Sequence, residues 1–161
     1  MHEKHAFKRQ LIIGVIGGSE AQEGECQIAE EVGREVAKRG GILICGGETG
    51  IMEAASRGAA LEGGITVGIL PGFSKYEANP YIGIPIVTGM SHARNIIIVR
   101  SSDVIIAIDG GYGTLSEIAF ALKLRTPIIG INTWEVSADI KKAKTAKEAV
   151  DLAFTIAHSK P

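Results

Sequence analysis

Near-continuous runs of aliphatic residues alternate with amphipathic segments along the whole of this 161-residue chain. Six of the runs predict strands, at 11–17, 41–45, 65–70, 84–88, 104–108 and 127–131. Five segments with apolar residues at i, i+3 or i+4 spacing predict helices, at 25–39, 51–62, 92–100, 114–124 and 145–158. Strands that are apolar on both faces are typical of parallel sheets, which helices cover on both sides. The alternation therefore predicts an α/β fold, a single Rossmann-like domain over residues 1–161 with a doubly wound parallel sheet flanked by helices.

Glycine-containing turns follow four of the predicted strands. They are Gly17-Gly18-Ser19, Gly46-Gly47, Pro71-Gly72 and Gly110-Gly111. In open parallel sheets, ligands bind in the crevice outside the carboxyl ends of the strands. The turns are therefore expected to offer backbone to one shared crevice. Gly17, Gly18, Ser19, Gly46 and Gly47 are candidate ligand-binding residues on this ground.

The segment Asp109–Glu117 joins an apolar strand to the start of a helix. A glycine-rich turn at this place leaves backbone N–H groups unpaired, and the helix dipole favours an anion beside them. The segment therefore predicts a phosphate cradle with a carboxylate, Glu117, one helical turn away. The residues expected to form the cradle are Gly110, Gly111, Tyr112, Gly113 and Thr114. Tyr112 either stacks on the ring of a ligand or shields the turn.

Two familiar phosphate motifs do not fit the glycine turns. A Walker loop requires a Lys after its last glycine, and no glycine turn here has one. A dinucleotide fingerprint requires Gly-x-Gly-x-x-Gly after the first strand, where this chain has Gly14-Val15-Ile16-Gly17-Gly18-Ser19. The turns therefore favour a nucleoside monophosphate or a related phosphorylated small molecule over NAD.

Composition excludes several other classes of protein. The formal net charge of −1 gives no general attraction to nucleic acid, and no run of 18 apolar residues predicts a membrane span. Cys26 and Cys45 lack CxxC spacing and are expected to be free thiols. The polar start Met1–His5 predicts no signal peptide, and its His and Glu residues lack the His-Glu-x-x-His zinc spacing. We expect a cytoplasmic protein without a metal or a resident cofactor.

Three elements in the same order resemble the LOG-like Rossmann family, whose members often carry the label lysine decarboxylase. The family segment Pro-Gly-Gly-x-Gly-Thr-x-x-Glu is matched from Gly110 to Glu117, and its Met-x-x-Arg-Lys setting by Met90–Asn95. The Gly-Gly-x-x-x-Gly-Leu-Met turn is matched by Gly46–Met52. The chain is most similar to a short bacterial and archaeal branch, and it also resembles a plant and algal molybdenum-cofactor carrier protein.

The resemblance implies a nucleoside 5′-monophosphate phosphoribohydrolase, which releases free base and ribose 5-phosphate. In the family, a Glu and an Arg act together, and they correspond here to Glu117 and Arg94 as catalytic residues. A carboxylate beside the ribose would stabilise the positive charge that develops there, and Arg94 would hold the carboxylate or the phosphate. The resemblance also supports an alternative, a carrier or sensor of a nucleotide or a molybdenum cofactor. Two departures favour this alternative: Asp109 stands where the family has Pro, and Asn95 where it has Lys.

Each candidate residue also has a purely structural interpretation. Glu117 could be an acid that the helix dipole favours near a helix start, and Arg94 could form a surface ion pair with a carboxylate. Thr114 could cap the helix. Met52 and Met90 are expected to be core residues. A pyridoxal-dependent decarboxylase is rejected because no predicted strand end has a lysine for a Schiff base.

Two further expectations concern surfaces. The aliphatic run Ile96–Val99 lies in a helix that should be partly exposed, which predicts a homodimer or a higher even homo-oligomer. Residues 71–85 form a long loop that is either a lid over the ligand or an ordinary connection.

Overall fold

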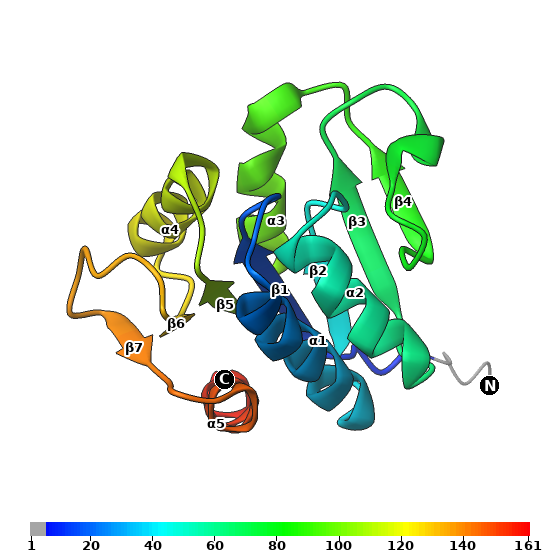
Figure 1. Cartoon of the computed structure of the whole chain (residues 1–161). Helices are drawn as coiled ribbons and strands as arrows, with labels where there is room; N and C mark the ends of the chain where they lie inside the picture. The colour runs from blue at the N-terminus through cyan, green and yellow to red at the C-terminus, as the bar shows by residue number, and fades with distance from the viewer. Residues whose placement is uncertain (1–5) are drawn as a thin grey trace.

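Seven strands form one parallel sheet within residues 6–161, the part of the chain that the computed structural model describes (Figure 1). The strands are β1 (Ile12–Gly17), β2 (Ile42–Cys45), β3 (Thr66–Leu70), β4 (Ile84–Val87), β5 (Val104–Ile108), β6 (Ile128–Ile131) and β7 (Ile140–Lys142). Their order in the sheet is β4-β3-β2-β1-β5-β6-β7, and every neighbouring pair is parallel. The predicted fold class is confirmed; the expectations for Met1–His5 lie outside the described residues.

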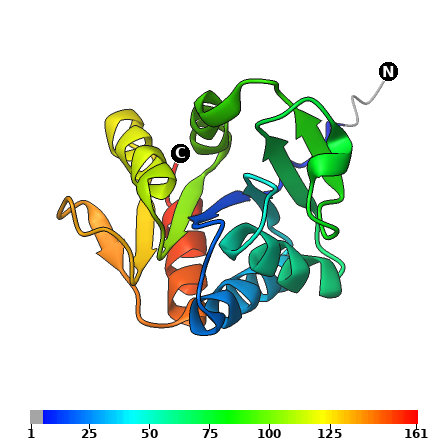
Figure 2. The same ribbon diagram turned by 45° about the horizontal axis from the view of Figure 1, so that its top comes forward.

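Five α-helices cover the two faces of the sheet. They are α1 (Glu23–Lys38), α2 (Ile51–Leu61), α3 (Asn95–Ser101), α4 (Tyr112–Leu124) and α5 (Ala146–His158). Two short 3-10 helices, η1 (Lys75–Glu77) and η2 (Ser91–Arg94), lie in the connections before β4 and α3. Figures 1 and 2 show α1, α2 and α5 on one side of the sheet and α3 and α4 on the other. Each side has its own apolar core.

The contact between α1 and α2 depends on two glycines. A Cβ atom at Gly33 would lie 1.9 Å from the carbonyl oxygen of Ala55, and one at Gly58 would lie 1.9 Å from that of Glu30. Both distances are far below van der Waals contact. The two helix backbones therefore touch, and any larger residue at either position would force them apart.

Two expectations about the elements need correction. Strand β7 was not predicted, because it is a short edge strand in which Ile140 alone is buried and Lys141 and Lys142 face solvent. The predicted helix 92–100 is divided: the chain turns through η2 before α3 begins at Asn95. Residues 92–94 of the predicted helix have 3-10 geometry, which is frequent at the N-terminus of an α-helix, so the prediction fails in the type of helix over its first turn.

The chain reverses its direction of winding between β1 and β5. Strands β2 to β4 extend the sheet on one side of β1, and β5 to β7 extend it on the other. The connections that leave the carboxyl ends of β1 and β5 therefore diverge to opposite faces and leave a crevice between them. The turns after these two strands contain Gly17-Gly18-Ser19 and Gly110-Gly111.

Candidate functional site

A cavity of about 290 Å³ opens at this crevice. Its lining comprises Gly17, Gly18, Ser19, Glu48, Met52, His92, Arg94, Asn95, Gly111, Tyr112, Gly113, Thr114 and Glu117. The structure thus brings together nine of the twelve residues predicted for the site. Glu48, Met52, His92 and Asn95 were not predicted as site residues. None of residues 71–85 lines this cavity; instead, the Asn79 side chain donates to the carbonyl of Glu48 at 2.8 Å and holds that turn in place.

The other three predicted residues pack behind the cavity. A Cβ atom at Gly46 would lie 2.7 Å from Nη2 of Arg94, so the glycine makes room for the guanidinium. A Cβ atom at Gly47 would lie 2.6 Å from the Leu70 side chain. Gly110 has a φ of 110° and packs against the side chain of Thr114. These positions therefore need small residues for the shape of the site.

The turn after β5 presents a row of free donors. Among the described residues, none accepts a hydrogen bond from the backbone N–H groups of residues 110–114. Asp109 has a φ of 50°, a conformation that proline cannot adopt, so the departure from the family pattern changes the backbone of the turn. N–H groups at the start of the 13-residue helix α4 are an arrangement that binds anions.

Glu117 is buried one turn into α4, with 7% of its surface exposed. Its carboxyl oxygens accept no hydrogen bond from any group in residues 6–161. Burial raises the pKa of this carboxyl from 4.5 to about 8; Arg94 opposes the rise, and Glu48 adds to it. The raised pKa favours the protonated form of this side chain near neutral pH. Its burial, which the sequence pattern does not reveal, outweighs the neighbouring cation.

Arg94 is also buried, although a surface ion pair was one interpretation of it. Its Nε donates to the carbonyl of Ile69 at 2.9 Å, and its Nη2 donates to Glu48 at 2.8 Å. Its Nη1 donates to the side chain of Asn95. These contacts use three of the five N–H groups of a guanidinium, which leaves two for a ligand in the cavity.

Asn95 links the arginine to the glycine turn. Its Nδ2 donates to the hydroxyl of Ser116 at 3.2 Å, and that hydroxyl donates to the carbonyl of Gly113 at 2.6 Å. The residue that replaces the family lysine is thus almost fully buried and joins α3 to the start of α4. It forms a polar bridge between Arg94 and the glycine turn after β5.

Replacing Arg94 by methionine is expected to lower the free energy of unfolding by about 2–4 kcal/mol. The change leaves the buried carbonyl of Ile69 and the amide of Asn95 without their donor. Arg100→Met, at an exposed position of α3, is the matched control and should change stability by about 0.5 kcal/mol or less. Urea denaturation measures both variants; equal losses would contradict the role of the buried network.

The remaining expectations have mixed outcomes. Met52 is a core residue, as predicted, and it also lines the cavity, whereas Met90 is 44% exposed and not a core residue. Cys26 and Cys45 are free thiols. No lysine lines the cavity, and no group of three or more His, Cys, Asp or Glu side chains in residues 6–161 could hold a metal ion. The same residues contain no helix long and apolar enough to cross a membrane.

The fold and the crevice define a parallel α/β protein with a glycine-rich turn at the switch point of its sheet. This chain belongs to the SLOG cluster4 family, whose sequence model matches residues 10–159. The predicted resemblance to LOG-like proteins is confirmed.

Three known proteins are similar to this chain over different shares of its length. The structure of a molybdenum cofactor binding protein from Rippkaea orientalis superposes with a TM-score of 0.87 at 37% identity, over 92% of this chain and 98% of that one. An uncharacterized protein of Archaeoglobus fulgidus is 45% identical over 86% of this chain and 91% of its own length. A probable cytokinin riboside 5′-monophosphate phosphoribohydrolase of Oryza sativa subsp. japonica is 32% identical over 70% of this chain. The match spans only 46% of the rice protein.

Proposed function

We propose that this chain binds a nucleoside 5′-monophosphate in the crevice and hydrolyses its N-glycosidic bond, with release of free base and ribose 5-phosphate. One observation carries the proposal: a buried carboxyl group, whose pKa is raised by burial, lies one helical turn from a row of free backbone N–H groups. The first group can give a proton, and the second can hold a phosphate. The name of the rice relative supports the same reaction.

The residues divide the reaction between them. The N–H groups of residues 110–114 and the two free N–H groups of Arg94 bind the 5′-phosphate and fix the position of the ribose. Glu117 gives its proton to the base as the bond between C1′ and the base nitrogen breaks, and both bonding electrons leave with the base. The ribose develops oxocarbenium character, and water adds at C1′ and loses a proton to the Glu117 carboxylate. Base and ribose 5-phosphate leave, and Glu117 is protonated again.

The alternative is a carrier or sensor that holds a phosphorylated ligand without converting it. The likeness to the molybdenum cofactor binding protein supports it, because that structure matches nearly the whole of both chains. The departure at Asn95 also supports it, since a charge of the phosphoribohydrolases is missing from the site. In this case the cradle would hold the phosphate of a molybdenum cofactor or a nucleotide as cargo.

Binding and turnover must be measured on the same protein to separate the two functions. Calorimetric titration with AMP and with adenosine tests the cradle, and chromatography of the mixtures tests conversion. The proposed function requires AMP to bind more tightly than adenosine, because adenosine lacks the phosphate, and requires adenine to appear. Equal binding of the two compounds would contradict the phosphate site. Tight binding of intact AMP would favour the carrier.

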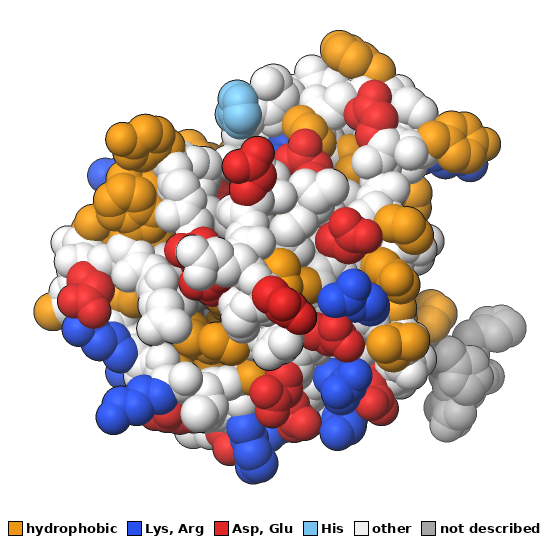
Figure 3. Space-filling model, in the orientation of Figure 1, with side chains coloured by type: hydrophobic (Ala, Val, Ile, Leu, Met, Phe, Trp, Pro, Cys, Tyr) orange, Lys and Arg blue, Asp and Glu red, His pale blue; other side chains and the backbone are white. Residues whose placement is uncertain are grey.

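We further infer that a second copy of this chain covers the outer edge of β4. We expected Ile96–Val99 to form an exposed apolar surface for contact between copies. Ile98 and Val99 are instead fully buried against the sheet and α4. Exposed apolar side chains gather instead along β4 and its flanking segments: Phe73, Tyr76, Ile84, Ile86, Val87 and Met90. Figure 3 shows such side chains at the right-hand margin, over η1 and β4. Strand β4 has no charged residue, and Pro85 in it lacks an N–H group for strand pairing, so the two copies would meet through these apolar side chains.

Ile86→Lys is expected to convert an assembly of two or more copies into a monomer, because it places a charge in the middle of this edge. Light scattering during size exclusion at micromolar concentration measures the mass. Val136→Lys changes an exposed apolar residue far from β4 in the fold and should leave the mass unchanged. A monomeric wild type would contradict the inference, as would an assembly that tolerates Ile86→Lys.

A further inference from the structure

The loop between β6 and β7 contacts the back of the glycine turn. The hydroxyl of Thr133 donates to the carbonyl of Asp109 at 2.7 Å. The indole Nε1 of Trp134 donates to the carbonyls of Gly110 and Gly111, at 3.1 Å each. Three successive carbonyls of the turn are therefore held by two neighbouring side chains from a distant part of the sequence.

These bonds set the direction of the N–H groups on the other side. In a trans peptide, the C=O of one residue and the N–H of the next point in opposite directions, and the chain has no cis peptide in residues 6–161. With the carbonyls of residues 109–111 turned towards Thr133 and Trp134, the N–H groups of residues 110–112 must point away from them. These N–H groups are among the free donors of the phosphate cradle.

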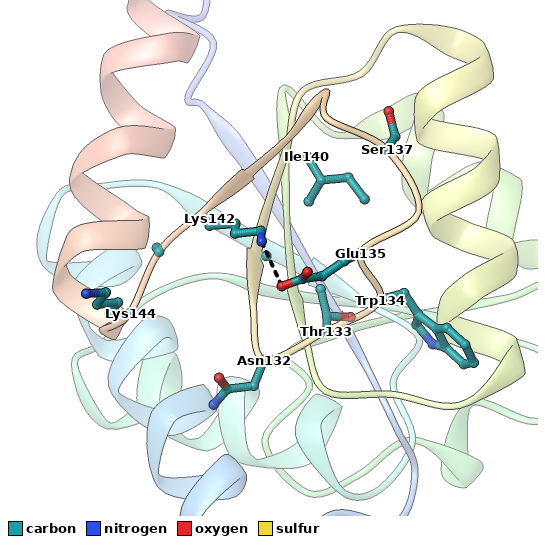
Figure 4. Close-up of a pocket in the computed structure, with 10 residues that line it drawn as sticks. Asn132, Thr133, Trp134, Glu135, Ser137, Ile140, Lys142 and Lys144 are labelled. Atoms are coloured by element: carbon teal, nitrogen blue, oxygen red, sulfur yellow. Dashed lines mark ion pairs between the residues drawn. The ribbon is translucent and has the colours of Figure 1, made fainter.

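The loop that carries the two residues packs against the edge of the sheet. A Cβ atom at Gly130 would lie 2.8 Å from the Thr133 methyl group, so Thr133 packs directly on β6. Glu135, two positions on, forms an ion pair with Lys142 of β7 at 2.8 Å, drawn as a dashed line in Figure 4. The ring of Trp134 also stacks on Tyr112, with centroids 6.2 Å apart. Thr133 and Trp134 also line a second cavity, of about 210 Å³, whose lining residues all come from the segment 130–144.

We propose that Thr133 and Trp134 are positioning residues for phosphate recognition: they hold the turn Asp109–Gly111 in the conformation that presents its N–H groups to a phosphorylated ligand. Neither residue lines the crevice. The conformation needs external support, because Asp109 has a positive φ that side chains rarely adopt. The proposal rests on the proposed phosphate site and adds the residues that shape it.

Thr133→Val removes the hydroxyl and keeps the shape of the side chain, while Thr133→Ser keeps the hydroxyl and is the rescue control. Trp134→Phe removes the indole N–H and keeps an aromatic ring against Tyr112. Titration with AMP, inorganic phosphate and adenosine is expected to show about fivefold to tenfold weaker binding of AMP and phosphate by Thr133→Val and Trp134→Phe. Thr133→Ser should bind like the wild type, and adenosine should bind equally to all four proteins. A merely structural role would weaken all three ligands together.

Amide hydrogen exchange of the ligand-free proteins tests whether Thr133 and Trp134 hold the turn, independently of ligand binding. The N–H groups of Asp109 and Leu115, which flank the turn and donate to the carbonyls of Ile131 and Gly111, should exchange faster in Thr133→Val and Trp134→Phe than in the wild type and Thr133→Ser. Unchanged exchange, or unchanged AMP binding in both loss variants, would overturn the proposal. If the wild type binds neither AMP nor phosphate, the proposed function fails, and faster exchange in the loss variants would still support the role of the two residues in holding the turn.

Discussion

Glu117→Gln is expected to slow the release of base from a nucleoside 5′-monophosphate by about 10²- to 10⁴-fold, the usual contribution of a positioned proton donor. Glutamine has nearly the same shape as protonated glutamate and fills the same buried position, but it cannot give a proton to the leaving base. The affinity for AMP should change little, because the phosphate binds at the glycine turn and Arg94. Release is measured by chromatography, and affinity by calorimetry.

The matched control is Glu31→Gln, an exposed position on α1 that lies outside the crevice. It should leave both release and affinity unchanged. Wild-type rates in Glu117→Gln would rule out a proton donor at this position. A loss of AMP binding equal to the loss of release would place Glu117 in ligand binding instead.

The second large effect is on the pH dependence of stability. Burial raises the pKa of Glu117 from 4.5 to about 8, so the folded state binds more protons than the unfolded state between these values. The free energy of unfolding contributed by this group is therefore complete below about pH 4.5 and declines as the pH rises to about 8. At about 1.4 kcal/mol for each unit of pKa, the loss amounts to several kcal/mol.

Urea denaturation of the wild type and Glu117→Gln at pH 5.5, 7 and 8.5 measures this effect. Glutamine does not ionise, so the variant should gain stability relative to the wild type as the pH rises. The difference between the two proteins should be greatest at pH 8.5. A constant difference across the three pH values would mean that Glu117 is ionised in the folded protein throughout.

Most of the fold could be predicted because hydrophobic patterning is local. The five consecutive aliphatic residues Val104–Ile108, for example, predict a buried strand, and all five are buried in β5. The failures occur where local pattern is weak. Strand β7 has one buried residue, and the first turn of the predicted helix 92–100 has 3-10 geometry that its sequence does not indicate. The contact of α1 with α2 through Gly33 and Gly58 depends on two segments meeting in space.

The candidate site could also be predicted only in part. The glycine turn could be predicted, since its spacing between strand and helix is itself the signal. Glu48, Asn95, Thr133 and Trp134 come from three other parts of the chain. No motif connects Thr133 and Trp134 with Gly110 or Arg94. The charge of Glu117 could not be predicted, because it depends on burial. Sequence therefore identifies the groups that can contact a ligand, and the structure identifies the groups that orient them.

Release of free base by the wild-type protein tests the central claim most directly. The protein is incubated with AMP, GMP, CMP, UMP and IMP in turn, and base and ribose 5-phosphate are quantified together. The proposed function requires at least one monophosphate to give both products in equal amounts, at a rate that Glu117→Gln lowers by about 10²- to 10⁴-fold. Bound but unconverted nucleotide in every case would contradict it and would make the protein a carrier or sensor.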